Sequence, residues 1–229
     1  MSRFKVLLLL VLLAGCSGSK DPVARGRSYF VGLGCITCHR VGDKGGGQAG
    51  PDLTTVGFRK TPEWLRLWLA NPAAWKPGTA MPNFKLKDNV REDLVAYLSS
   101  LKGEIYRAKP PWDNPALKAD PLKRGEMLFA RVGCVGCHGE RGQGGYPNNN
   151  VVGGKILSLT YAADGYSKDE LRDLLHKGRV SLPADASQPP PMIRMPPWGQ
   201  YLTDDEINDL VEYVYSLRPA TAAKDDWSE

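Results

Sequence analysis

The sequences CITCH at residues 35–39 and CVGCH at residues 134–138 decide how this chain is interpreted. In each sequence two cysteines stand three positions apart, and a histidine follows the second. Thiols at this spacing lie about one helical turn apart, so each can add to one vinyl group of a haem while the histidine binds the iron. The pattern therefore predicts two covalently bound haem c groups. The residues assigned to them are Cys35, Cys38, His39, Cys134, Cys137 and His138.

A Cys-x-x-Cys pair also occurs in zinc sites and in redox dithiols. Zinc would need four ligands, and the second cysteine pair lies about a hundred residues away in the sequence. A thioredoxin-like dithiol would need a β-α-β pattern, which the sequence lacks. The histidine that follows each pair fits haem attachment best.

The two motifs belong to an internal repeat. Residues 21–39 and 120–138 share an Asp-Pro, an Arg-Gly, a Phe and a Gly at the same spacing before each motif. The closing segments, Leu94–Leu101 and Leu210–Leu217, also match. Domains this small bury little apolar surface alone, so a large buried cofactor would stabilise each of them. The expected organisation is a first domain at 21–102, a stiff Pro-rich linker at 103–119, a second domain at 120–219 and a tail at 220–229.

Several segments show helical signals. Apolar residues recur with helical period in both closing segments. Thr203 and Glu206 form a capping box before the second of them, and another helix is expected to begin at Thr61-Pro62-Glu63.

Each repeat resembles a class I c-type cytochrome domain, and the tandem resembles the diheme members of that family. The resemblance implies an all-α fold in which a few helices wrap around each covalently bound haem. It also implies that Gly26 and Phe30 of the first helix pack across the closing helix near Tyr97. The corresponding residues of the second repeat are Gly125, Phe129 and Tyr213.

The family resemblance also suggests the second axial ligand of each iron. Residues 76–82, KPGTAMP, resemble the methionine loop of the family and make Met81 the ligand in the first domain. The second repeat offers Met192 and Met195. Met195 is preferred because a proline follows it, as a proline follows Met81.

Other candidate ligands are interpreted as structural residues. Met127 falls in the opening helix, before the haem motif. His176 is the one histidine outside the motifs, and it ends an amphipathic helix, where its charge would suit the helix C-terminus.

The surroundings of each proximal histidine are expected to differ. Pro51 lies 12 residues after His39, as in the family, where the proline carbonyl accepts the N–H of the histidine ring. Pro147 lies only 9 residues after His138, which puts the same role in doubt. The second repeat also carries an extra stretch ending in Gln188–Pro191, interpreted as a surface loop, with partner docking as the alternative.

Three tryptophans are expected to cluster in the first domain. The preferred interpretation is packing over the haem edge, and the alternative is a docking surface for a redox partner. These residues are Trp64, Trp68 and Trp75.

The N-terminus resembles a bacterial lipoprotein signal. Residues 1–15 combine two basic residues with an apolar run too short to cross a bilayer. Cys16 follows a lipobox-like Leu-Ala-Gly, so it is expected to carry lipid, and residues 16–20 would form a tether. An ordinary signal peptide is the alternative. The expected location is the periplasmic side of the cell envelope, and Ser17 favours the outer membrane over the inner.

The predicted function is single-electron transfer without bond chemistry, because histidine and methionine together would fill both axial positions of the iron. The expected partners are redox proteins or respiratory complex subunits, with no small-molecule substrate. Charge is nearly balanced, at 30 Lys and Arg against 25 Asp and Glu, and no basic patch suggests nucleic acid.

Two alternative functions remain at this stage. One is an anchored electron-transfer subunit of a larger quinol-oxidising or terminal oxidase or reductase complex, because residues 62–84 resemble cytochrome domains fused to oxidase subunits. The other is a diheme peroxidase, which would need one iron with a displaceable ligand.

Overall fold

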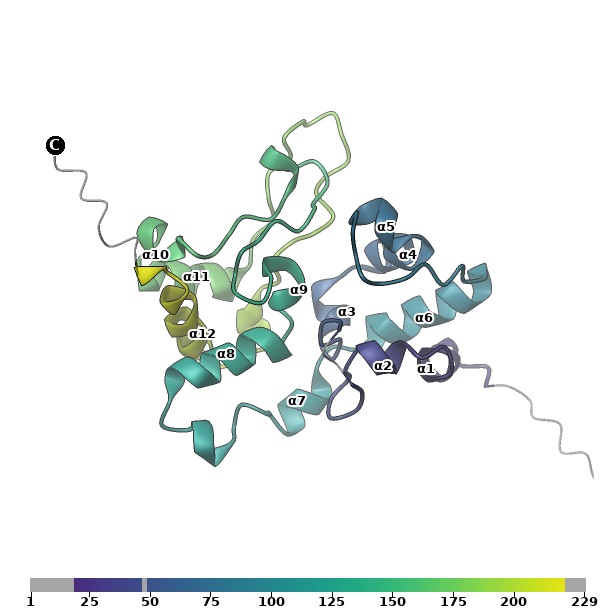
Figure 1. Ribbon diagram of the computed structural model, residues 1–229, viewed down its shortest axis with the longest axis horizontal. Helices are drawn as coiled ribbons and strands as arrows, with labels where there is room; N and C mark the ends of the chain where they lie inside the picture. The colour runs from purple at the N-terminus through teal and green to yellow at the C-terminus, as the bar shows by residue number, and fades with distance from the viewer. Residues whose placement is uncertain (1–18, 47–48, 221–229) are drawn as a thin grey trace, which may run out of the picture.

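The computed structural model describes residues 19–46 and 49–220. The predicted signal peptide, Cys16 and nearly all of the predicted tail lie outside these residues. Figure 1 shows two helical lobes side by side, which we call the first and second domains. The described residues form helices and isolated bridges but no strand, so the all-α prediction is confirmed for them.

The helices follow the repeat. The first domain contains α1 (Pro22–Gly32), α2 (Cys35–Cys38), α3 (Val56–Arg59), α4 (Pro62–Ala70), α5 (Pro72–Trp75) and α6 (Asp88–Ser100). The connecting segment contains α7 (Glu104–Ala108) and the 3-10 turn η1 (Pro115–Leu117). The second domain contains α8 (Pro121–Arg131), α9 (Val135–His138), η2 (Val152–Gly154), α10 (Ala162–Gly165), α11 (Lys168–Lys177), η3 (Trp198–Gln200) and α12 (Asp204–Ser216).

A close crossing of the opening and closing helices forms the frame of the first domain. A Cβ atom on Gly26 would lie 1.9 Å from the carbonyl oxygen of Asp93, so only glycine lets α1 approach α6 this closely. Beside the crossing, the rings of Phe30 and Tyr97 pack with their centroids 5.5 Å apart. The predicted crossing near Tyr97 is therefore confirmed.

The second domain repeats this crossing between α8 and α12. A Cβ atom on Gly125 would lie 2.0 Å from the carbonyl oxygen of Asp209, and the rings of Phe129 and Tyr213 lie 5.2 Å apart. Thr203 and Glu206 form the predicted capping box at the start of α12. The same residue types therefore build the same frame in both domains.

The connecting segment is packed between the domains. Tyr106 on α7 is only 1% exposed and donates a hydrogen bond of 2.5 Å to the Asp52 carboxylate of the first domain. Arg131 of the second domain lies 3.5 Å from the same carboxylate. Trp112 is also buried, and its indole donates to Glu206 of α12. The segment therefore joins the two domains through buried contacts.

The extra stretch of the second domain is braced by three consecutive asparagines, at positions 148–150. Asn148 is buried and binds both the N–H and the carbonyl of Ile193, at 3.1 and 2.9 Å. Asn149 and Asn150 bind the main chain of five further residues in this stretch, namely Asp185, Gln188, Pro189, Pro190 and Met192. The stretch is therefore an exposed but tied loop, part of the projection at the top of Figure 1.

Candidate functional site

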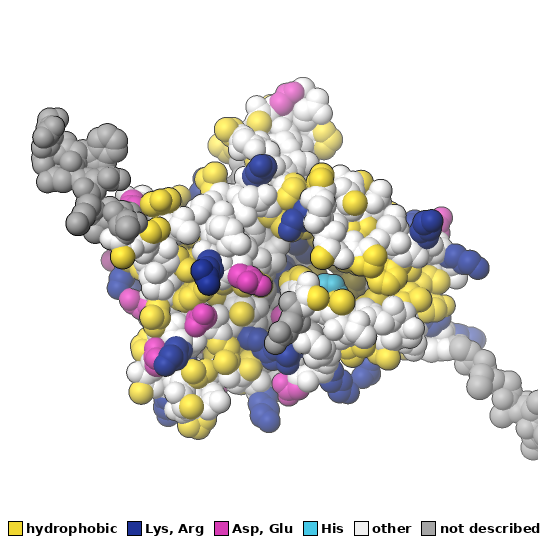
Figure 2. Space-filling view, viewed as in Figure 1, with side chains coloured by type: hydrophobic (Ala, Val, Ile, Leu, Met, Phe, Trp, Pro, Cys, Tyr) yellow, Lys and Arg dark blue, Asp and Glu magenta, His cyan; other side chains and the backbone are white. Residues whose placement is uncertain are grey.

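The first haem motif opens onto a cavity of about 1130 Å³. Cys35 and Cys38 lie on α2, and both line this cavity together with His39. The cavity reaches across the domain boundary, because Cys137 of the second motif is also in its lining. Figure 2 shows hydrophobic side chains gathered around a hollow on this face, with a histidine inside it.

His39 is held in place by its main-chain surroundings. Its Nδ1 atom lies 3.0 Å from the carbonyl oxygen of Pro51, which is the contact predicted from the sequence. A Cβ atom on Gly50 would lie 2.5 Å from the imidazole, so the glycine makes room for the ring. Burial lowers the pKa of His39, and the ring is therefore neutral near pH 7, as iron binding requires.

Met81 faces the same cavity from the loop after α5. Its main-chain N–H lies 3.3 Å from the hydroxyl of Thr79. The indole N–H of Trp68 donates to the Met81 sulfur at 2.9 Å. The predicted histidine and methionine ligands of the first domain are therefore brought to one cavity.

The tryptophan cluster packs against the second domain. The rings of Trp64 and Trp68 stack with centroids 5.2 Å apart, and Trp75 lies edge-on to Trp64 at 6.0 Å. Tyr146 of the second domain lies 6.3 Å from Trp68, and the Trp75 indole donates to the Pro147 carbonyl at 3.3 Å. The cluster is therefore packed against the second domain rather than free for docking, and Trp64 and Trp68 also line the cavity beside the first haem motif.

The second motif has different surroundings. The Nδ1 atom of His138 is buried and makes no hydrogen bond with the described residues. Burial lowers the pKa of His138 to about 4, and the main-chain carbonyl of Leu157 opposes this shift. The Pro147 carbonyl is used by Trp75 instead. His138 is therefore a neutral, unpaired imidazole, which fits an iron ligand, but it lacks a counterpart of the Pro51 contact.

Met192 and Met195 lie in different cores. The Met195 side chain packs against the core of the second domain, where Cys134 also packs. Its main chain pairs with Arg179, with both hydrogen bonds at 2.9 Å. The Met192 side chain packs against a core that belongs mainly to the first domain but that Cys137 of the second motif also contacts. Neither methionine lines the cavity that contains His39.

The remaining candidate ligands have structural positions. His176 lies in the last turn of α11, with its Nε2 atom 3.3 Å from the Asp204 carboxylate. Met127 lies on α8 and packs against the second core. Both positions agree with the structural interpretation.

Two buried cations stand at the domain boundary, and sequence reasoning missed both. Arg59 is 7% exposed and donates to the carbonyls of Asp52 and Gly133, at 2.9 and 3.2 Å. Lys60 is 8% exposed, and its Nζ atom lies 3.5 Å from the Cys137 sulfur. Burial lowers the pKa of both side chains. In the sequence they read as two ordinary surface charges.

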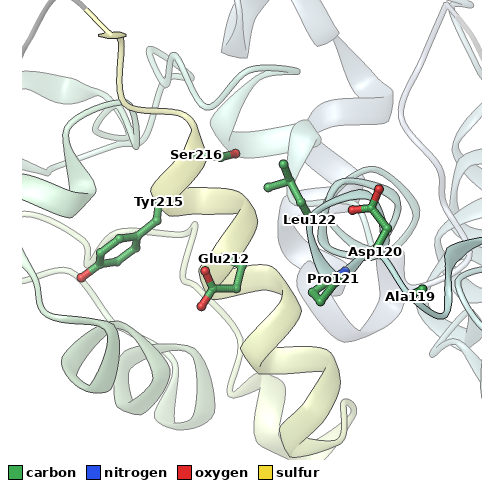
Figure 3. Close-up of a pocket in the computed structure, with 7 residues that line it drawn as sticks. All are labelled: Ala119, Asp120, Pro121, Leu122, Glu212, Tyr215 and Ser216. Atoms are coloured by element: carbon green, nitrogen blue, oxygen red, sulfur yellow. The ribbon is translucent and has the colours of Figure 1, made fainter.

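A second hollow, of about 570 Å³, lies between the start of α8 and the end of α12 (Figure 3). It is wide open and lined by no histidine, cysteine or methionine. One of its lining residues, Glu212, is already paired with Lys168 at 2.7 Å. It therefore offers no ligand for iron.

Across residues 19–46 and 49–220, no helix has the length and apolar character needed to cross a membrane. The same residues contain no cluster of three or more His, Cys, Asp or Glu side chains that could hold a metal ion.

The donor set fits two covalently attached haems. The four cysteines of the motifs are free thiols, and the two adjacent imidazoles are neutral. The cavity beside the first motif is lined mainly by apolar side chains and closed by two potential axial ligands. These features match the needs of a haem held by thioether bonds and iron ligands.

Comparison with known proteins agrees with this geometry. The family described as Cytochrome c matches residues 23–102 and again residues 122–218. The Cbb3-type cytochrome c oxidase subunit CcoP of Helicobacter pylori is 24% identical over 206 residues, which cover 88% of this chain and 61% of that protein. The same subunit from strain 52 is 23% identical over the same shares. The chain thus spans about 61% of the length of these relatives. No solved structure gives a match.

A chain with two such domains carries two covalently bound haem c groups and transfers electrons. The protein therefore belongs to the cytochrome c family, with two domains of that family in tandem.

Proposed function

We propose that this protein passes single electrons between redox partners of a respiratory chain, with its two haems held in adjoining domains. The covalent bonds would be made by Cys35, Cys38, Cys134 and Cys137. The iron ligands would be His39 and Met81 in the first domain, and His138 and Met195 in the second. Haem iron with these ligands gains and loses one electron without needing an open position.

The observation that carries this proposal is the shared cavity. His39 and Met81 line it from the first domain, and Cys137 lines it from the second. Gly136, inside the second motif, lies beside Pro51, whose carbonyl oxygen is the hydrogen-bond partner of the His39 ring. The two motifs are thus neighbours across the domain boundary, which suits transfer within one chain.

A redox titration of the purified protein with absorption spectra tests the proposal. We expect two haems per chain, both low-spin and both with the absorption of a methionine–iron bond. Each should take up one electron. A single haem, or a high-spin iron that binds carbon monoxide once reduced, would contradict it.

A second candidate function is that of a subunit in a larger terminal oxidase complex. The similarity to the CcoP subunits over 88% of this chain favours it. Purification from membranes in mild detergent distinguishes the two. Other oxidase subunits should accompany the chain if it is a subunit, and a single component should appear if it is a separate carrier.

The diheme peroxidase alternative is tested by hydrogen peroxide. Neither fully oxidised nor half-reduced protein should consume peroxide above the rate of a bis-ligated control cytochrome. Sustained turnover would favour the enzyme.

We also propose that Cys16 anchors the protein by lipid on the periplasmic side of the cell envelope. Cys16→Ala should release the protein from washed membranes into the soluble fraction, whereas Ser17→Ala should leave it bound. Retention of the Cys16 variant on membranes would rule out the lipid anchor. Separation of the inner and outer membranes would then show which of them holds the protein.

A further inference from the structure

Lys60 is a charged side chain of the first domain that lies against the haem motif of the second. It follows Arg59 at the end of α3, and its Nζ atom lies 3.5 Å from the sulfur of Cys137. That thiol stands where a thioether bond would join the protein to haem. Lys60 is therefore placed beside the attachment edge of a cofactor that its own domain does not bind.

Two aromatic rings stabilise the charged form of Lys60, whereas its burial and the neighbouring Arg59 oppose it. The ammonium group lies 4.2 Å from the ring centre of Trp64 and 5.5 Å from that of Tyr146, and aromatic faces attract cations at these distances. Burial opposes the charge and lowers the pKa from its ordinary value of 10.5. No ion pair of Lys60 is present among the described residues, and Asp52, an acidic residue that lines the same cavity, is engaged by Tyr106 and Arg131.

A buried cation without a carboxylate partner exerts a strong field on its neighbours, because little solvent screens it. Oxidised haem iron carries one more positive charge than reduced iron. A fixed positive charge beside the haem therefore destabilises the oxidised state more than the reduced state. The effect on the cofactor is a higher reduction potential.

We propose that Lys60 of the first domain raises the reduction potential of the haem attached to Cys134 and Cys137 in the second domain. Arg59 locks this arrangement. It donates to the carbonyl of Gly133, next to Cys134, while Thr55 donates to the carbonyl of Val132 at 2.6 Å. The potential of the second haem thus depends on the docking of the first domain. This inference rests on the proposed presence of haem at the second motif.

The test compares the two reduction potentials of the full-length holoprotein in four forms. These are the native protein, Lys60→Met, Lys60→Arg and Lys76→Met. Methionine keeps the apolar stem but removes the charge, whereas arginine keeps the charge. Lys76 is the matched control, because it lies 5.0 Å over the same Tyr146 ring and lines the same cavity, whereas the hydrogen bond to Cys137 comes from Lys60. The reduction potential of the first haem is identified as the one that shifts in a Met81→Ala protein.

Lys60→Met should lower the potential of the second haem more than that of the first. Lys60→Arg should restore it, and Lys76→Met should change it less. The difference between native and Lys60→Met proteins should persist at high salt, since the charge is buried. Circular dichroism in the haem absorption band would check that each variant keeps its fold.

Equal potentials in the native and Lys60→Met proteins would overturn the proposal. A lower potential of the first haem alone would also overturn it. So would a potential of the second haem in Lys60→Arg above the native value, because this would mean that Lys60 is uncharged in the native protein. The reduction potentials are measured with an electrode and need no biological partner. Failure of the protein to exchange electrons with respiratory membranes would therefore contradict the proposed function but not the proposed effect of Lys60.

Discussion

At the scale of single residues, the two histidines that follow the haem motifs differ in their support. His39 has a carbonyl partner at 3.0 Å in Pro51, whereas the corresponding nitrogen of His138 has none among the described residues. A hydrogen bond to this nitrogen fixes the ring and strengthens the histidine as a ligand. The two irons should therefore not be equivalent, even with the same ligand types.

The assignment of Met195 gives the first prediction. Met195→Ala should remove the methionine–iron absorption of one haem and leave that of the other, because its side chain lies in the second core with Cys134. Met192→Ala is the control and should keep both bands, because Met195, unlike Met192, is followed by a proline as Met81 is, although Met192 packs against the same core as Cys137. Absorption spectra of the oxidised proteins measure the bands. The reverse pattern would make Met192 the ligand.

Residue types at fixed spacing could be predicted from the sequence. The positions of His39 and Met81 around one cavity agree with the motif and the loop from which they were predicted. The buried state of Arg59 and Lys60 could not be predicted, because it arises from contact with another domain. The spacing of Pro147 already put a bond to the Nδ1 atom of His138 in doubt, but the use of the Pro147 carbonyl by Trp75 could not be predicted.

At the scale of elements, the crossing of α1 and α6 gives the second prediction. Gly26→Ala should lower the free energy of unfolding by about 3 kcal/mol or prevent folding, because its Cβ would meet main-chain atoms that cannot move aside. Gly32→Ala in the same helix is the control. Its Cβ would meet nothing within 4 Å, and the change should stay below about 1 kcal/mol. Urea unfolding measures both values, and equal stability of the two variants would contradict the close crossing.

The asparagine brace gives the third prediction. Asn150 has a left-handed main chain with φ of 51°, so Asn150→Gly removes the side-chain bonds without adding strain. Each lost bond contributes about 1 kcal/mol, and a loss of about 1.4 kcal/mol speeds local opening about tenfold. Hydrogen exchange should therefore accelerate at the amides of Ala184 and Asp185, which bind Asn150.

Asn83→Gly is the control for this experiment, because Asn83 binds only the nearby N–H of Lys85. In the Asn83→Gly protein, the hydrogen-exchange rates around residue 184 should equal those of the native protein. Unchanged exchange in the Asn150 variant would mean that the loop is held by other contacts.

Helix ends were predictable where a local signal exists, as at Thr203 and Glu206, and so was the crossing near Tyr97. Nothing in the sequence predicted a role for the asparagine run at positions 148–150. The run can act as a brace only because residues 185–193 lie beside it in the fold, and no periodic pattern in the sequence predicts that they do.

At the scale of the whole molecule, buried contacts of the connecting segment join the domains. Tyr106 donates to Asp52, and Arg131 approaches the same carboxylate from the second domain. Sequence composition predicted a stiff linker from its prolines. The packing of Tyr106 and Trp112 could not be predicted, because isolated aromatics in a linker have no periodic pattern.

Tyr106 gives the fourth prediction, on pH dependence. Burial and the Asp52 carboxylate raise the pKa of the folded Tyr106 above its ordinary value of 10. A raised pKa means that the stabilisation is complete below pH 10 and declines as pH rises further, because the unfolded chain loses its proton first. Tyr106→Phe should therefore cost about 2 kcal/mol at pH 7 and show a shallower loss of stability above pH 10.

Urea unfolding at a series of pH values measures this difference. Tyr29→Phe is the control, since its side chain is only half-buried on α1. Identical alkaline slopes in the native and Tyr106→Phe proteins would show that the Tyr106–Asp52 contact does not contribute.

The buried domain boundary also imposes an order on biosynthesis. Cys38 is exposed in the assembled chain, whereas Cys137 is only partly accessible and has the Lys60 side chain of the other domain against its sulfur. An enzyme that joins haem to the second pair of thiols must reach them before that side chain closes over them. We therefore expect haem ligation at the second motif to precede the docking of the domains.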